Sequence, residues 1–174
     1  MAVAFHFATR TRFLIVICCV LASGAHASAQ TAPQRADRIV VIKSERVLEL
    51  IYQGRVVKSY PIALGRHPLG PKRRLGDGRT PEGVYIVDGR SSKTTYHREL
   101  HISYPSDNDR MRAAAAHVAP GGGIFIHGMP PRFGHTDPVR FFRDWTDGCI
   151  AVGNIAIEEI WNAVADGTEI EIRP

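Results

Sequence analysis

Residues 38–63 have the sequence RIVVIKSERVLELIYQGRVVKSYPIA. This stretch contains three short runs rich in isoleucine and valine, and polar turn-forming residues separate them. β-branched runs of this length, divided by turn residues, are typical of consecutive β-hairpins. The stretch therefore predicts an antiparallel meander, with strands at 39–42, 47–52 and 55–63.

Short strand-like runs continue to the C-terminus, so the whole domain is predicted to be mainly β. These runs lie at 84–87, 99–103, 124–127, 149–152 and 168–172.

Two segments between these runs have helical patterns. Residues 106–117 contain a run of alanines, preceded by Ser106 or Asp107 as N-cap. The second segment begins at Asn154, and its apolar residues recur at i, i+3, i+4 and i+7, which predicts one buried face. We expect this helix to end at Gly167. Its apolar residues are Ile157, Ile160, Trp161 and Val164, of which Trp161 is expected to anchor the core.

A long loop at 65–83 connects the meander to the next strand, and it is rich in glycine, proline and arginine. Loops of this length in compact domains are usually functional or disordered. Its basic residues are expected either to steer an acidic substrate or to form a solvated surface. They are Arg66, His67, Lys72, Arg73, Arg74 and Arg79.

Residues 1–29 have the pattern of a cleaved export signal. Two arginines precede ten mainly apolar residues at 13–22, and small residues follow, with cleavage expected after Ala27 or Ala29. The apolar run is half of the ~20 residues that a membrane-spanning helix needs, although a retained N-terminal anchor is the alternative. We therefore expect a signal peptide at 1–29, a linker at 30–37 and a single folded domain at 38–174. The mature protein would act in the periplasm or cell envelope, with membrane contact only through the signal before cleavage.

The net charge limits the classes of molecule that the protein is expected to bind, and the cysteine content limits the roles of its thiol. The net charge of +5 falls to +3 without the two arginines of the signal, which suits an anionic polymer. No interleaved aromatic and basic pattern accompanies this charge, so no nucleic-acid partner is expected. Cleavage would remove Cys18 and Cys19 and leave Cys149 alone. An unpaired thiol in an exported protein is either buried and inert or retained for chemistry.

Cys149 follows a glycine, and a strand 22 residues earlier ends in His127-Gly128. A free thiol has a pKa of about 8.5, so a nearby imidazole is needed to activate it near neutral pH. Gly148 allows a substrate carbonyl to approach closely, and the backbone N–H groups there can face an oxyanion. These residues predict a nucleophile, Cys149, and a base, His127. A structural histidine and an inert buried cysteine are the alternative.

Ile126-His127-Gly128, followed by Thr146-Asp147-Gly148-Cys149-Ile150, resembles the signature of the L,D-transpeptidase (YkuD) catalytic domain. That signature is HG, a variable loop, and then S/T-x-G-C-I/V/L. Residues 39–65 also resemble the opening hairpins of the family, and 76–83 match its Gly/Thr-Pro-x-Gly loop. The likeness extends in the right order over nearly all of the chain from residue 38 onward.

This resemblance implies a β-sandwich or barrel-like fold with one or two short packed helices. It also implies that Cys149 attacks a peptidoglycan stem peptide at the carbonyl before a terminal D-residue and forms an acyl-enzyme. An amine of a neighbouring stem peptide then resolves it into a 3→3 cross-link. His127 would act as general base, oriented by the carbonyl of Gly128, and the N–H groups of Gly148 and Cys149 would bind the oxyanion. Neither a metal nor an organic cofactor is implied.

Further side chains near these motifs are weaker predictions. Thr146 is expected to contact the thiolate or the substrate, or else to cap a turn. Tyr104 is a candidate to donate its hydroxyl to the oxyanion, and His101 a candidate to line the cleft, with packing as the alternative for both. Asp147 is either solvated or orients His127 or His135.

Position 151 departs from the family pattern, because an arginine commonly follows Cys-I/V/L and Ala151 stands here. The chain resembles a subgroup with alanine at this place, some of whose members resemble hydrolases that detach a lipoprotein from peptidoglycan. A hydrolase or endopeptidase that uses the same Cys-His site, with a cell-wall-linked lipoprotein as partner, is therefore a second hypothesis. Arg132, Arg140 and Arg143 are candidates to replace the missing charge.

Two further classes remain as alternatives. A non-catalytic peptidoglycan-binding module would keep the fold without needing the cysteine or the histidine. A zinc hydrolase would use His101, His127 and His135, but the chain has no His-Glu-x-x-His or His-x-His arrangement to support it.

Overall fold

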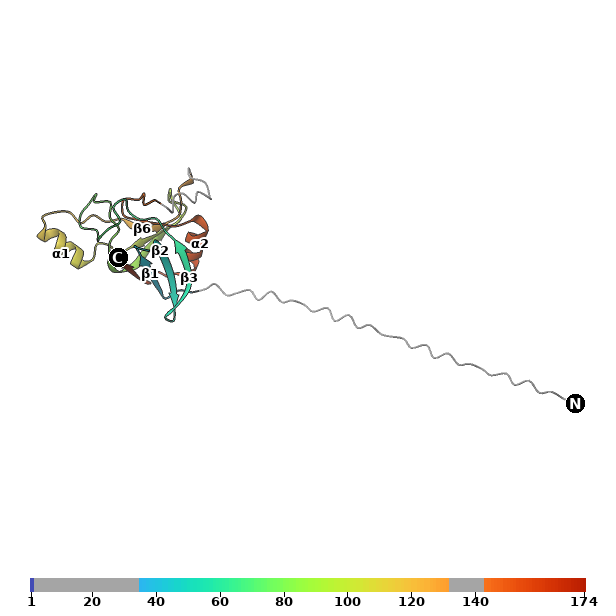
Figure 1. Ribbon diagram of the computed structural model, residues 1–174. Helices are drawn as coiled ribbons and strands as arrows, with labels where there is room; N and C mark the ends of the chain where they lie inside the picture. The colour runs from blue at the N-terminus through green and yellow to red at the C-terminus, as the bar shows by residue number, and fades with distance from the viewer. Residues whose placement is uncertain (2–34, 132–142) are drawn as a thin grey trace. The chain divides into compact units, whose positions relative to one another are not determined.

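The computed structural model describes residues 1, 35–131 and 143–174. The predicted signal peptide, its cleavage sites and most of the linker lie outside the described residues, as do Arg132, His135 and Arg140. The described part contains eight strands and two helices (Figure 1). They are β1 (Arg38–Ile42), β2 (Val47–Tyr52), β3 (Arg55–Pro61), β4 (Gly83–Ser91), β5 (Glu99–Ile102), α1 (Asp107–Ala115), β6 (Ile124–His127), β7 (Ile150–Ala151), α2 (Asn154–Ala163) and β8 (Glu169–Arg173).

The strands form one curled sheet in the order β3-β2-β1-β8-β4-β5-β6-β7. The pairs β1–β8 and β6–β7 are parallel, and the other neighbours are antiparallel. The chain that follows β3 returns to the far edge, where Ala63 pairs with Ala151 and Gly65 with Thr146. The two ends of the sheet therefore meet, and the predicted mainly β, barrel-like fold with short packed helices is confirmed.

The opening meander follows the predicted strand boundaries closely. Its tight turn at Gln53-Gly54 has positive φ at both residues, 50° and 75°. Consecutive positive φ values match the twist of a two-residue hairpin, which explains the glycine there. The third strand ends at Pro61 rather than at the predicted Ala63, because Ala63 leaves β2 to pair across the sheet with Ala151.

Both predicted helices are present, and both are shorter than predicted. Ser106 is the N-cap of α1, since its hydroxyl accepts the Asp109 N–H while the Asp109 carboxylate accepts the Ser106 N–H. Helix α2 ends at Ala163 rather than at Gly167, because Val164 takes an extended conformation and is buried. Figure 1 shows α2 against the strands, whereas α1 stands out from the sheet.

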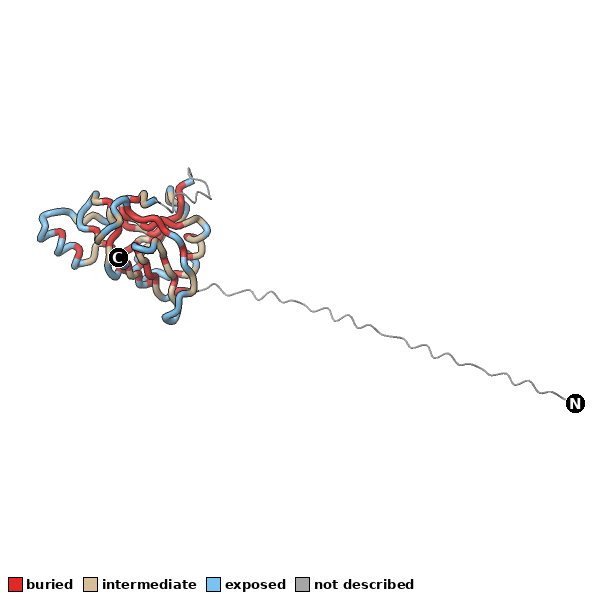
Figure 2. Tube along the Cα trace, viewed as in Figure 1, coloured by how far each residue is buried: buried red, intermediate tan, exposed pale blue. Residues whose placement is uncertain are grey.

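A single apolar cluster fills the interior between the curled sheet and α2. Ile157 and Ile160 of α2 are fully buried in it, as predicted. Trp161 packs against the cluster while partly exposed, with the guanidinium groups of Arg90 and Arg98 at 4.9 and 4.7 Å from its ring. The buried residues concentrate in the strands, and the surrounding loops are mostly exposed (Figure 2). Among the described residues, no helix is both long and apolar enough to span a membrane.

Two buried lysines hold the long basic loop in place. Lys43 of the first turn donates to the carbonyl oxygens of Gly70 and Thr80, at 2.8 and 3.1 Å, and pairs with Glu82 at 2.7 Å. Lys72 pairs with Asp77 at 2.8 Å. The Asp77 carboxylate also accepts the backbone N–H groups of Arg73, Arg74 and Arg79.

Replacing Asp77 by asparagine is expected to destabilise the fold in a pH-dependent way. Burial opposes the charge of Asp77, but three backbone N–H groups and Lys72 outweigh burial and lower its pKa from 3.8 to about 2. A depressed carboxyl pKa stabilises the fold above the unfolded value, and that contribution is lost as the pH falls through the folded value. The wild-type charge is therefore worth about 2 kcal/mol at pH 7, with about half remaining at pH 3.

Guanidinium unfolding of Asp77→Asn at pH 7 and pH 3 measures this effect. We expect a loss of about 2–4 kcal/mol at pH 7, because Lys72 also loses a buried partner, and a clearly smaller loss at pH 3. Asp107→Asn is the matched control, since the Asp107 side chain is exposed. An equal loss for Asp77→Asn at both pH values would contradict this assignment.

Candidate active site

Two neighbouring strands, β6 and β7, bring the predicted nucleophile and base to one face of the sheet. In β6, Ile124 and Ile126 point into the core, so Phe125 and His127 point to the opposite face. The β6–β7 register pairs Ile126 with Ile150, which sets Cys149 beside Phe125. Paired residues of adjacent strands share a face, so Cys149 and His127 are diagonal neighbours on it.

That face contains a hollow of about 370 Å³ into which both side chains open. The hollow brings together Cys149, His127, Thr146 and Asp147 of the sequence-predicted residues. It is also lined by three residues that sequence reasoning missed, Tyr96, Glu99 and Trp145. Its remaining lining comes from Gly123 and Phe125.

The imidazole of His127 is fixed in one orientation. It is 3% exposed, and its Nδ1 lies 2.7 Å from the carbonyl oxygen of Gly128. A carbonyl only accepts, so Nδ1 carries the hydrogen and Nε2 is left as the basic nitrogen. The rings of Tyr96 and Trp145 lie 4.3 and 5.7 Å from the imidazole centre and restrict its rotation.

Gly128 is glycine because of how closely its backbone packs. A Cβ there would lie 2.7 Å from the side-chain oxygen of Asn154 and 2.9 Å from the carbonyl oxygen of Tyr96. The Gly128 N–H donates to the carbonyl oxygen of Arg98 at 3.1 Å. The glycine thus lets the end of β6 lie against the start of α2, which holds the carbonyl that contacts His127.

The thiol of Cys149 is half-buried, and its Sγ lies 3.7 Å from the carbonyl oxygen of Gly123. Burial raises the pKa of Cys149, and the charges of Glu99 and Asp147 raise it further. The N–H of Phe125 and the charge of Lys72 act in the opposite direction and lower this pKa by less. Burial lowers the pKa of His127 by more than its hydrogen bond to Gly128 and the charge of Glu99 raise it. At neutral pH the pair is therefore a neutral thiol beside a neutral imidazole, which is free to accept a proton.

The loop before Cys149 is braced by Thr146. Its hydroxyl accepts the Gly148 N–H at 3.1 Å and donates to the carbonyl oxygen of Cys149 at 2.7 Å. Gly148 has a φ of 132°, and a Cβ there would lie 2.6 Å from the carbonyl oxygen of Arg79. The Gly148 N–H and the Thr146 hydroxyl are thus both engaged within the loop, and glycine is required at 148 by conformation and by contact.

The other predicted site residues lie outside this hollow. Tyr104 is buried, its hydroxyl donates to the carbonyl oxygen of Pro120 at 3.0 Å, and it does not line the hollow. His101 contacts Asp88 at 2.5 Å, and its ring packs edge-on against Phe125. The structure does not bring either residue to the thiol. Asp147 forms an ion pair with Arg66 rather than with His127.

Ala151, where the family pattern has arginine, is fully buried. Its N–H and carbonyl oxygen bond to the backbone of Ala63 at 2.8 and 2.9 Å. Arg143, one of the proposed substitutes for that charge, is exposed. Within residues 35–131 and 143–174, no group of three or more His, Cys, Asp or Glu side chains is arranged to hold a metal ion.

Replacing Glu99 by glutamine is expected to shift the pH profile. Glu99 is the cross-strand partner of His127, and its charge raises the pKa of both His127 and Cys149. Without that charge, both values fall. The acid limb of kcat/KM, which follows the neutral fraction of His127, should therefore move to lower pH, and iodoacetamide should alkylate the thiol faster at pH 8. The control Asp88→Asn neutralises a carboxylate outside the hollow and should leave the acid limb and the alkylation rate unchanged. If Glu99→Gln shifts neither of them, the charge of Glu99 does not act on His127 and Cys149 as assigned here.

Comparison with known proteins relates this geometry to a family. The family model described as the L,D-transpeptidase catalytic domain (YkuD) matches residues 36–172. YafK of Escherichia coli K12, named as an L,D-transpeptidase, is 33% identical over 132 residues, which are 72% of this chain and 46% of that protein. The chain therefore spans about half the length of this curated relative.

Solved structures share the fold. The helical cell shape determining protein Pgp2 of Campylobacter jejuni superposes with a TM-score of 0.60 at 24% identity, over 77% of this chain and 46% of that one. Bd1075 of Bdellovibrio bacteriovorus superposes with a TM-score of 0.55 at 23% identity, over 80% of this chain and 51% of that one. An L,D-transpeptidase of Xylanimonas cellulosilytica superposes with a TM-score of 0.50 at 20% identity, over 80% of this chain and 61% of that one. At these identities the likeness is one of fold.

Proposed function

This chain belongs to the L,D-transpeptidase (YkuD) catalytic domain family, and from that premise we propose that it is an exported cysteine acyltransferase acting on peptidoglycan stem peptides. The observation that carries the proposal is the shared hollow of Cys149 and His127, with the imidazole fixed through Nδ1 to Gly128. Nε2 is then the basic nitrogen on the face that carries the thiol. A nucleophile and a base with an oriented ring are the elements that cysteine acyl transfer needs.

The first half of the reaction forms a thioester. Sγ of Cys149 attacks the carbonyl carbon before the terminal D-residue of the donor peptide, while Nε2 of His127 takes the thiol proton. The resulting oxyanion accepts the Cys149 N–H, since the Gly148 N–H already bonds to Thr146. The C–N bond then breaks, the imidazolium returns its proton to the leaving amine, and the D-residue departs.

The second half resolves the thioester. The neutral amine of an acceptor stem peptide attacks the same carbonyl carbon, and His127 takes a proton from that amine. The C–S bond breaks, and the imidazolium returns the proton to sulfur. The product is a 3→3 cross-link, and the enzyme is restored without a metal or organic cofactor.

Hydrolysis is the second candidate function, and Ala151 is the observation that favours it. Position 151 is buried and uncharged, so it offers no cation to a substrate carboxylate. Water in place of the amine would convert the same thioester into a free carboxylate. The chain would then release cross-links or a lipoprotein attached to peptidoglycan, as the likeness to the alanine-containing subgroup suggests.

Residues 1–29 are proposed to direct export and to be removed, which would leave a domain at 38–174 behind a short linker. The substrate of the family lies in the cell envelope outside the cytoplasm, and this supports export.

Mass spectrometry of the protein incubated with disaccharide-tetrapeptide muropeptides tests the proposal. The expected products are dimers with 3→3 links, absent with Cys149→Ala. Shortened monomers without dimers would make the chain a hydrolase. Unchanged muropeptides with the wild-type protein would contradict the catalytic proposal for this substrate class.

A further inference from the structure

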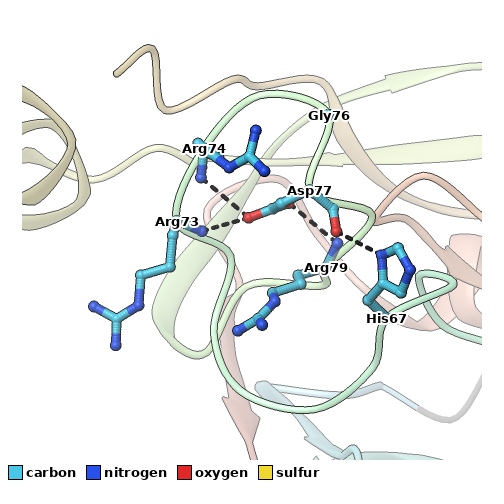
Figure 3. A pocket seen from close by; sticks show the side chains of 6 residues that line it. All are labelled: His67, Arg73, Arg74, Gly76, Asp77 and Arg79. Atoms are coloured by element: carbon cyan, nitrogen blue, oxygen red, sulfur yellow. Dashed lines mark hydrogen bonds between the residues drawn. The ribbon is translucent and has the colours of Figure 1, made fainter. Parts of the chain in front are cut away.

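A second hollow, of about 380 Å³, lies within the long basic loop and shares no lining residue with the Cys149 hollow. Three arginines and one histidine line it, and one acidic residue is present (Figure 3). The lining residues are His67, Arg73, Arg74, Gly76, Asp77 and Arg79.

The one acid in this hollow does not neutralise the arginines around it. Asp77 is held by the Lys72 ammonium at 2.8 Å, and its oxygens accept backbone N–H groups rather than guanidinium groups. Figure 3 shows dashed lines from this carboxylate to the backbone nitrogens of Arg73 and Arg74, and it shows the guanidinium group of Arg73 extending away from the carboxylate. The negative charge of Asp77 is therefore already matched by Lys72.

The arginine side chains of the hollow have no partners among the described residues. Arg66 of the same loop pairs with Asp147, and Lys72 pairs with Asp77. Within the described parts of the chain, by contrast, no ion pair or hydrogen bond forms at the guanidinium groups of Arg73, Arg74 and Arg79. His67 adds a ring whose Nδ1 donates to the carbonyl oxygen of Asp77 at 2.9 Å, leaving Nε2 free of that bond. The hollow thus concentrates unmatched positive charge.

Backbone contacts join this hollow to the loop that presents Cys149. The His67 N–H donates to the carbonyl oxygen of Gly78, and the Arg66 N–H donates to that of Thr146, both at 3.0 Å. A Cβ on Gly148 would lie 2.6 Å from the carbonyl oxygen of Arg79. A lining residue of the basic hollow therefore lies in backbone contact with the residue that precedes the nucleophile.

We propose that this hollow binds a carboxylate of the stem peptide whose carbonyl meets Cys149. Guanidinium groups bind carboxylates through paired, charge-assisted hydrogen bonds, and stem peptides carry several carboxylates. The hollow would supply the positive charge that Ala151 does not provide. This inference rests on the proposed function and names a substrate subsite for it.

Peptide binding in the Cys149→Ala background tests this inference apart from turnover. The probe is a stem tetrapeptide, titrated by calorimetry into the single variant and into the same protein carrying Arg73→Ala, Arg74→Ala and Arg79→Ala. We expect the triple replacement to raise Kd at least tenfold. A control with Arg35→Ala, Arg55→Ala and Arg110→Ala removes the same charge from exposed positions outside the hollow and should change Kd less than twofold.

A tetrapeptide with amidated carboxylates identifies the group that is bound. This amidated peptide should bind the Cys149→Ala protein weakly, and adding the three arginine replacements should not weaken its binding further. Inorganic phosphate should compete with the free-acid peptide only weakly. Equal loss of affinity for both peptides, or full displacement by phosphate at micromolar concentration, would overturn the carboxylate assignment in favour of a general anion site.

Steady-state kinetics separates this inference from the proposed function. In the protein that retains Cys149, the triple replacement should raise KM about tenfold and change kcat less than threefold. If the wild-type protein turns over the substrate and the triple variant has the same KM, the subsite inference is wrong and the proposed function stands. If the peptide binds through its carboxylate but the wild-type protein shows no turnover, the proposed function is wrong and the subsite inference stands.

Discussion

Replacing Cys149 by alanine is expected to lower kcat by about 10⁴-fold or more, because the proposed thioester cannot form without the sulfur. The side chain opens into the hollow, and its contact with the carbonyl oxygen of Gly123 is long, at 3.7 Å. Its removal should therefore change the free energy of unfolding by less than about 1 kcal/mol. Muropeptide conversion by mass spectrometry, with guanidinium unfolding of the same sample, measures both quantities.

Cys149→Ser provides a matched control of nearly equal size. A hydroxyl is far more difficult to deprotonate than a thiol, so this variant should be folded and also largely inactive. Conversion by Cys149→Ala at more than a few per cent of the wild-type rate would contradict a cysteine mechanism. Retention of the cellular role by that variant would favour the non-catalytic binding module.

Replacing His127 by glutamine is expected to lower kcat about 10²–10⁴-fold at pH 7. Burial raises the pKa of Cys149, so without a base few thiolates form near neutral pH. Raising the pH toward the thiol pKa should restore part of the activity of the variant, because hydroxide then supplies the thiolate. A pH–rate series for wild type and variant measures this difference in profile.

His101→Gln is the matched control for this series. His101 lies on the next strand and contacts Asp88 outside the hollow, so the same change there should alter kcat less than threefold. A purely structural role for His127 predicts parallel pH profiles for wild type and His127→Gln. Parallel profiles, or a large loss in His101→Gln, would contradict the assignment of His127 as the base.

The mainly β fold follows from local patterns in the sequence, whereas the meeting of Cys149 with His127 was indicated by the family motifs and depends on the pairing of β6 with β7. β-branched runs divided by turn residues define the strands, and both residues lie at or next to the ends of short strands. The positions of Tyr104 and His101 depend on register, which alternation alone does not supply. Strand β5 ends at Ile102, and Tyr104 beyond it turns inward to contact Tyr85. Pairing with Phe125 places His101 beside the wall of the hollow rather than within it.

Residues missed by sequence reasoning became visible only through long-range pairing. Glu99 faces the site because β5 pairs it with His127, and nothing in its local sequence indicates this. The basic loop was evident from composition. Which of its charges are neutralised was not, since Arg66 is paired by Asp147, far along the chain. Lys72 and Asp77 are close in sequence, but their burial depends on the folded loop.

Rapid-quench mass spectrometry of the intact protein tests the thioester at Cys149 most directly. Excess enzyme is mixed with a donor tetrapeptide and stopped in acid from milliseconds to minutes, and the adduct is located by digestion. We expect a transient mass increase equal to the donor without its terminal D-residue, on the fragment that contains Cys149 and absent from Cys149→Ala. Product that accumulates while no time point carries an adduct on that fragment, or an adduct on another residue, would contradict this expectation.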